Sequence, residues 1–266
     1  MNNKGISYTL SLMLFSLVFL ALGLLFFQHS VEVSELYAYS SFNHKMYETD
    51  TSIQNMFSEA FLINSPVTVN TTKTSLTVQQ NLPVNFNEQE SLMQELKTYV
   101  ENDFNKVNIS LENFFSKHLL TLKPYDIAVK FEDSKTIEIE NNSAITGYLV
   151  SLSFSNNITG CSINVNNGGS LLLNFSATSS SGSCSGDYVN VADANINFNN
   201  NGNAVSYIID GDGKMTLDSN ATTTSEVTVL FTETDNPLLE IPIDIELVDT
   251  AFKFSKNSYV TFPSLS

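Results

Sequence analysis

An uninterrupted apolar segment dominates the first part of the chain, over residues 6–27. Its 22 residues carry no charge, and 14 of them are Leu, Ile, Val or Phe. A helix that rises about 1.5 Å per residue would extend roughly 33 Å over this segment, enough to cross a hydrocarbon core about 30 Å thick. A buried core helix of a soluble protein would rarely be this long or this uniform. The pattern therefore predicts a transmembrane helix.

Helical spacing of apolar residues continues over residues 28–62, with polar interruptions near Asn43 and Asp50. This segment is predicted to be a helical stalk that ends before Pro66, because proline disfavours helix at the residue that precedes it. The apolar positions that support the prediction are Leu36, Tyr39, Met46, Ile53, Met56, Phe57, Ala60 and Phe61.

Residues 63–124 have a mixed pattern. A short polar hairpin is predicted over 67–83, an amphipathic helix over 87–106, and one or two further helical turns within 111–120. The apolar face of the predicted helix consists of Leu92, Leu96, Val100 and Phe104.

Apolar and polar residues alternate along residues 125–266, as in half-buried strands of antiparallel sheets. The alternation is clearest over 148–155, 194–199 and 241–247. About nine to eleven short strands are expected, separated by Asn-, Gly- and Ser-rich turns. Tight turns are predicted at 166–169, 200–202 and 210–213. The predicted fold class is α+β: an N-terminal transmembrane helix extends into a long helical stalk, and a mixed segment and a C-terminal antiparallel β-sandwich or jelly-roll-like domain follow.

The charges beside the apolar segment predict its orientation. Lys4 precedes it, whereas Glu32 and Glu35 follow it and the next lysine is Lys45. The N-terminus is therefore expected in the cytoplasm and the C-terminal domain outside the cell. A secretory signal that is removed would have an apolar region of about 7–15 residues followed by small residues, whereas residues 25–30 are bulky. The helix is expected to remain as a single-pass anchor in the cell membrane, with the lipid bilayer as its partner.

The five residues before the apolar segment end in Lys4 and Gly5. A basic residue and a glycine directly before a long apolar helix resemble the class III, prepilin-type signal of archaeal type IV pilin-like proteins. The resemblance covers about residues 1–60. It implies that a peptidase removes a cytoplasmic leader, residues 1–5, and leaves Ile6 as the new N-terminus. Leu10 stands where bacterial pilins carry a glutamate.

Two functions fit this organisation. The resemblance implies a structural subunit whose apolar helix packs with other copies or other pilin-like subunits in a filament or pseudopilus. The alternative is a permanently anchored cell-surface binding or adhesion glycoprotein that does not form filaments. No phosphate-binding loop, nucleophile elbow or metal-binding histidine pair occurs in the sequence, so no catalytic residues are assigned and no enzyme is expected.

The net charge of −16, from 28 acidic and 12 basic residues, excludes nucleic acid as a partner, because phosphate binding requires a basic surface. Sixteen of the carboxylates lie between residues 131 and 250. Solvated sheet faces account for this excess, and cation binding is the alternative.

Cys161 and Cys184 are the two cysteines of the chain, and both lie in the same Gly- and Ser-containing stretch. In an exported domain they predict a disulfide worth roughly 3 kcal/mol, and free thiols are the alternative.

Asp210 and Asp212, in the sequence Asp-Gly-Asp-Gly-Lys, resemble half of a calcium loop, with Asp218 as a further ligand. A third ligand before the glycine and the final glutamate of an EF-hand loop are missing, so a plain hairpin turn and no cofactor are expected. Calcium binding is the alternative.

Six Asn-x-Ser/Thr sequons could accept glycans in an exported chain. Their asparagines are Asn70, Asn108, Asn141, Asn157, Asn174 and Asn220. Asn157 and Asn220 are favoured because loops are predicted around them.

Overall fold

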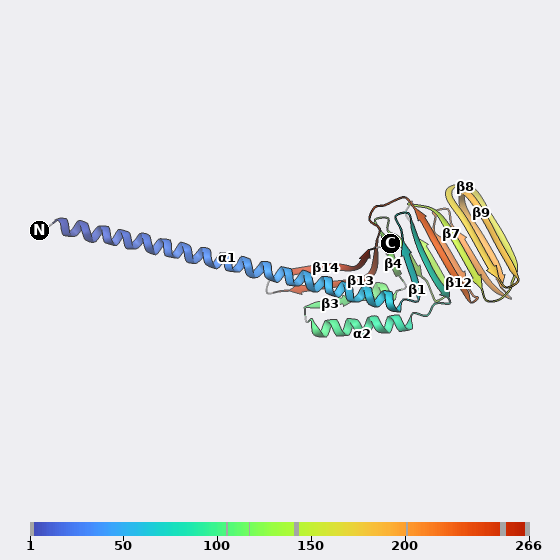
Figure 1. Ribbon diagram of the computed structural model, residues 1–266, viewed down its shortest axis with the longest axis horizontal. Helices are drawn as coiled ribbons and strands as arrows, with labels where there is room; N and C mark the ends of the chain where they lie inside the picture. Colours follow the sequence, from blue (N-terminus) through green and yellow to red (C-terminus); the bar gives the residue numbers. More distant parts are fainter. Residues whose placement is uncertain are drawn as a thin grey trace. The chain divides into compact units, whose positions relative to one another are not determined.

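The computed structural model describes residues 3–104, 106–116, 118–140, 144–200, 202–250 and 254–263 (Figure 1). The chain divides into two compact units, Met1–Thr51 and Ser52–Ser266. A long apolar helix comes first and a large β-rich sheet follows, which confirms an α+β fold.

The helices are α1 (Asn3–Asn64), α2 (Asn87–Asp103) and α3 (Glu112–Phe115). The strands are β1 (Val67–Thr71), β2 (Ser75–Leu82), β3 (Val107–Ser110), β4 (His118–Lys123), β5 (Ile127–Phe131), β6 (Thr136–Glu140), β7 (Ile145–Phe154), β8 (Ile158–Ser179), β9 (Gly182–Asn200), β10 (Asn203–Ile209), β11 (Met215–Ser219), β12 (Thr223–Phe231), β13 (Leu238–Asp249) and β14 (Phe254–Pro263).

Helix α1 is continuous over 62 residues and ends at Asn64, as Pro66 predicts. Its last residues belong to the second unit, and there one helical face is buried through Ile53, Phe57 and Phe61, each at most 1% exposed. The predicted apolar stripe is therefore a packing surface near the end of the helix, because residues spaced four apart lie on one face. Farther back, Leu36 and Tyr39 are exposed.

The described strands of the second unit all belong to one hydrogen-bonded sheet, in the order β1-β2-β12-β7-β8-β9-β10-β11-β6-β5-β4-β13-β14, with β3 also paired to β13. Strands β1 and β2 form the hairpin predicted for 67–83. Strands β1 to β4 thus join the same sheet as the strands after residue 124.

Strand β8 doubles back on itself. The amide of Ile158, its first residue, donates a hydrogen bond to Oγ of Ser179, its last residue, at 3.1 Å. A straight strand of 22 residues would separate these ends by about 70 Å. The reversal lies at 167–170, where the register with β9 is irregular and Gly168 has a φ of +124°. The turn predicted at 166–169 is thus a reversal inside one hydrogen-bonded element.

The reversal explains a departure from the predicted antiparallel sheet. After β7 the chain runs back along the first half of β8, turns, and returns along β7 with the second half. Strands β7 and β8 consequently pair in parallel, from Gly147 opposite Leu172 to Ser153 opposite Thr178. The other strand pairs of the described residues are antiparallel.

The other two predicted turns are confirmed. Strand β9 ends at Asn200 and β10 begins at Asn203, with Gly202 at a φ of +92° between them. Strands β10 and β11 are joined at 210–214, where Gly213 has a φ of +81°. Glycine fits both places because it adopts positive φ without a steric penalty.

The core follows the predicted alternation. Buried positions include Tyr148, Val150, Leu152 and Phe154 in β7 and Ile241, Ile243, Ile245 and Leu247 in β13. The prediction for α2 was wrong in part: the helix buries Gln89, Met93 and Val100, whereas Leu92 and Leu96 are half-buried and Phe104 is exposed. Helix α2 packs one face on the sheet, and the sheet selects a face rotated from the one expected.

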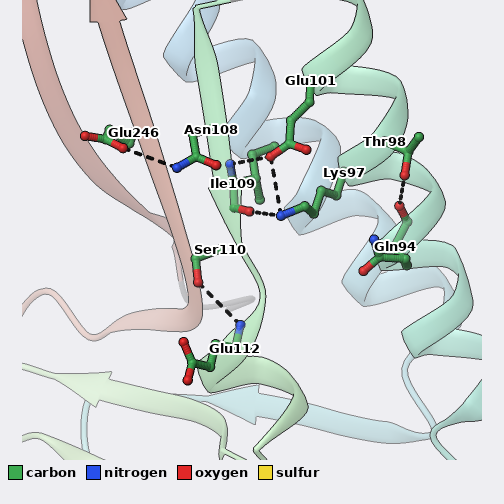
Figure 2. A network of polar contacts seen from close by, with 9 residues as sticks. All are labelled: Gln94, Lys97, Thr98, Glu101, Asn108, Ile109, Ser110, Glu112 and Glu246. Carbon is green, nitrogen blue, oxygen red and sulfur yellow. Dashed lines mark hydrogen bonds and ion pairs between the residues drawn. The ribbon is translucent and has the colours of Figure 1, made fainter.

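Helix α2 also covers the outer edge of β3 (Figure 2). The amide of Ile109 donates to Oε1 of Glu101 at 2.8 Å, and the carbonyl of Ile109 accepts a hydrogen bond from Lys97 Nζ. Lys97 and Glu101 lie one helical turn apart and form an ion pair at 3.4 Å. Two side chains thus satisfy the backbone groups that an additional strand would otherwise bind.

Candidate functional site

The apolar part of α1 is the first candidate site. From Met13 to Phe27 its large apolar side chains are exposed, with exposed fractions between 45% and 73%. Among the described helices, α1 alone is long and apolar enough to cross a membrane, judged by length and composition. This segment could therefore serve as a membrane anchor.

The predicted processing residues lie at the start of the same helix. Helix α1 begins at Asn3, so Lys4, Gly5 and Ile6 have helical backbone. Residues 3–5 of the predicted leader are therefore part of helix α1, while Met1 and Asn2 lie outside the described residues.

Cys161 and Cys184 form a disulfide, which confirms the predicted pairing and excludes the alternative of free thiols. Cys161 lies opposite Phe198 of β9, whereas Cys184 lies opposite Ala177 of β8. The bond therefore joins the first half of β8 to the first half of β9. These two segments come together because the β8–β9 hairpin folds back on itself at the reversal of β8. Along the described strand pairs, each of these halves is hydrogen-bonded on one side only, so the disulfide joins two open edges of the sheet.

The Asp210 turn uses its carboxylate internally. Oδ1 of Asp210 accepts hydrogen bonds from the amides of Asp212 at 3.1 Å and Lys214 at 3.0 Å. The amide of Gly213 donates to the carbonyl of Asp210 at 2.9 Å, which closes the turn. These bonds are those of an Asp-initiated hairpin turn.

Asp218 is not brought to this turn. It lies opposite Ser206, three residue pairs along the hairpin from Ile209 and Met215. At about 3.3 Å per residue this places its backbone roughly 10 Å from the turn. Among the described residues, no group of three or more His, Cys, Asp or Glu side chains could hold a metal ion.

The sequons differ in how their side-chain amides are used. Asn70, Asn108, Asn157, Asn174 and Asn220 are all exposed, and Asn141 lies outside the described residues. Asn108 and Asn174 donate Nδ2 to Glu246 and Asp187. Asn157 and Asn220 lie in the expected loops and accept hydrogen bonds through Oδ1, from Ser180 at 2.7 Å and Lys135 at 3.1 Å. Among the described residues, their Nδ2 atoms, to which a glycan attaches, make no hydrogen bond.

Two tyrosines, Tyr148 and Tyr207, are buried in the core near the Asp210 turn. The hydroxyl of Tyr148 donates to the carbonyl of Gly213 at 2.6 Å, and Tyr207 is 1% exposed. Within the described chain, the Tyr207 hydroxyl has no hydrogen-bond partner. Burial raises the pKa of both hydroxyls, so both stay protonated at neutral pH and neither can act there as a base.

Comparison of the chain with known protein families, curated proteins and solved structures finds no match. The function has to be inferred from the anchor helix, the disulfide-linked sheet and the surface chemistry of the chain itself.

Proposed function

We propose that the chain is a membrane-anchored, exported surface protein that acts as a pilin-like structural subunit of a filament or pseudopilus. The observation that carries this proposal is the apolar part of α1, whose side chains are exposed from Met13 to Phe27. The same helix continues without a break to Asn64, where it packs into the β-rich unit.

The exposed apolar side chains of α1 would gain free energy if lipid or another helix removed them from water. Twelve large apolar side chains are exposed between Met13 and Phe27. Burial of each is worth about 1.5–3 kcal/mol, so a covering would contribute on the order of 20 kcal/mol. Lipid tails supply it while the subunit is in the membrane, and the helices of other subunits supply it in a filament. A single helix can serve both states because it satisfies its own backbone hydrogen bonds.

A layered, sandwich-like or jelly-roll-like organisation is proposed for the outer domain. In its support, the ring of Phe198 in β9 lies 5.8 Å from that of Phe154 in β7 and 6.3 Å from that of Phe175 in β8. Phe175 lies in the second half of β8 and Phe198 in the second half of β9, and these halves belong to different arms of the folded β8–β9 hairpin. The contact between their rings therefore supports the packing of two layers.

Intact-mass measurement of the membrane-extracted chain tests the proposed processing. We expect loss of Met1 to Gly5, and we expect Gly5→Leu to prevent it. Gly23→Leu is the matched control, because Gly23 lies in the same helix with open space around it and should leave the cleavage unchanged.

The two functions are then separated by assembly. A cleaved subunit should be found in sheared, sedimentable filaments, and the Gly5→Leu chain should remain in the membrane fraction. An uncut N-terminus in the unmodified protein would contradict the pilin-like proposal. It would leave the permanently anchored surface protein as the function.

A further inference from the structure

A cavity of about 370 Å³ lies on the outer face of the three strands β3, β13 and β14. Six side chains that line it are Asn108, Ser110, Asp244, Glu246, Asn257 and Tyr259. They come from three segments that are far apart in the sequence. The cavity is separate from the anchor helix and from the disulfide.

The strand register gathers these side chains into two rows. Asp244 lies between Ser110 and Tyr259, and Glu246 lies between Asn108 and Asn257. Residues 244 and 246 share a face of β13 because strand side chains alternate. The intervening Ile245 points the other way and is 1% exposed. One face of this sheet is therefore core, and the opposite face is a hydrogen-bonding surface.

Part of this surface is available to a ligand. Oγ of Ser110 accepts a hydrogen bond from the amide of Glu112 at 3.5 Å. Asn108 Nδ2 donates to Glu246 Oε2 at 3.3 Å, a long bond that a competing ligand group could replace (Figure 2). Within the described chain, the Asp244 and Asn257 side chains make no hydrogen bond. Tyr259 is 51% exposed, so its ring offers an apolar face beside the two carboxylates.

The lining selects among ligand classes by its charge. Asp244 and Glu246 are carboxylates, and no lysine lines the cavity. Phosphates, nucleotides and acidic sugars are therefore disfavoured by like-charge repulsion, and the net charge of −16 acts in the same direction. A neutral ligand rich in hydroxyl groups fits best. Its hydroxyls can donate to carboxylates and accept from amides, while its C–H groups pack on an aromatic ring.

We propose that this surface binds a neutral carbohydrate, with the sugar ring on Tyr259 and its hydroxyls bonded to Asp244, Glu246 and Asn257. The cavity volume is at the small end of ligand sites, which span about 300–1,000 Å³, and suits a short or terminal saccharide. The proposal is independent of filament assembly. A filament or an anchored monomer would equally present this face to glycans.

The test uses the full chain in a detergent that has no sugar headgroup. Methyl α-mannoside, methyl β-galactoside and N-acetylglucosamine are titrated through the millimolar range while ligand-observed NMR saturation transfer is recorded. At least one of them should bind saturably. Tyr259→Ala should weaken that binding about tenfold, Asp244→Ala should also weaken it, and Tyr259→Phe should retain most of it.

Tyr99→Ala is the matched control, because Tyr99 is an exposed tyrosine on α2 that does not line the cavity. It should leave binding unchanged. Equal melting temperatures of all variants would show that they fold. The proposal is overturned if none of the sugars saturates the protein, or if Tyr259→Ala binds as well as the unmodified chain. Glucosamine, which carries an amine, is titrated as a charged comparison. Binding of glucosamine without binding of any neutral sugar would also overturn the proposal, since that result would indicate charge attraction to the amine.

Discussion

The amide of Ile158 donates to the hydroxyl of Ser179, so the first and last residues of β8 are in contact. The disulfide between Cys161 in β8 and Cys184 in β9 stabilises the same folded arrangement. It closes a loop with a sequence separation of 23. This corner of the sheet thus has two independent ties, one hydrogen-bonded and one covalent.

Removal of the disulfide should therefore lower the stability of the sheet. Cys161→Ser combined with Cys184→Ser is expected to reduce the free energy of unfolding by about 3 kcal/mol, because the unfolded chain regains the entropy of an open loop. Denaturant titration followed by circular dichroism measures the change. Ser162→Ala, beside Cys161 in the exposed half of β8, is the control and should change stability little. Thiol labelling of the unmodified chain without reductant should detect no free cysteine.

The reversal of β8 requires Gly169. A Cβ atom at this position would lie 2.1 Å from the carbonyl oxygen of Val191, which belongs to the backbone and has little room to move. Gly169→Ala is expected to destabilise the chain by about 1–3 kcal/mol through this clash. A melting curve provides the measurement.

Gly211→Ala is the control for that substitution, because nothing lies within 4 Å of a Cβ at Gly211. It should be neutral within about 0.5 kcal/mol. Equal effects of the two alanines would show that β8 does not depend on the close approach at Gly169.

The covered edge of β3 depends on Glu101. Glu101→Leu should leave the Ile109 amide without its acceptor and cost about 1–3 kcal/mol. Amide hydrogen exchange at Ile109 should become faster. Glu95→Leu, on an exposed position of the same helix, should leave this exchange rate unchanged. An unaltered rate in both variants would mean that some other group protects the edge.

The two buried tyrosines should respond oppositely to loss of their hydroxyls. Tyr148→Phe leaves the buried carbonyl of Gly213 without its donor, and should cost about 1–3 kcal/mol at neutral pH. Tyr207→Phe removes a buried hydroxyl that has no partner among the described residues, and should be neutral or stabilising. A destabilised Tyr207→Phe chain would indicate a partner for that hydroxyl.

Both tyrosines also predict sensitivity to alkaline pH. Burial raises the pKa of each, so the folded chain keeps protons that the unfolded chain releases. Their contribution to stability is complete below about pH 10 and declines as the pH rises above it. The hydrogen bond to Glu138 raises the pKa of Lys214 and acts in the same direction. Unfolding titrations between neutral and alkaline pH should show a decline that is shallower in Tyr207→Phe.

The sequence alone determined the linear features of this protein. The apolar segment, the stop at Pro66 and the alternation in β7 and β13 depend on hydrophobicity and backbone restriction, which act between residues close in the chain. The carboxylates of Asp244 and Glu246 could likewise be placed on the polar face of one strand. The two cysteines could be paired because the chain offers no other.

Only the tertiary structure decided which distant segments meet. The reversal of β8 makes its pairing with β7 parallel, and α2 turns Met93 inward instead of Leu92 because the sheet selects its packing face. Tyr259 joins Asp244 only through the register of β14 on β13. Strand register depends on the fit of whole faces and on turns elsewhere, so no local pattern around Tyr259 could have revealed the surface to which it belongs.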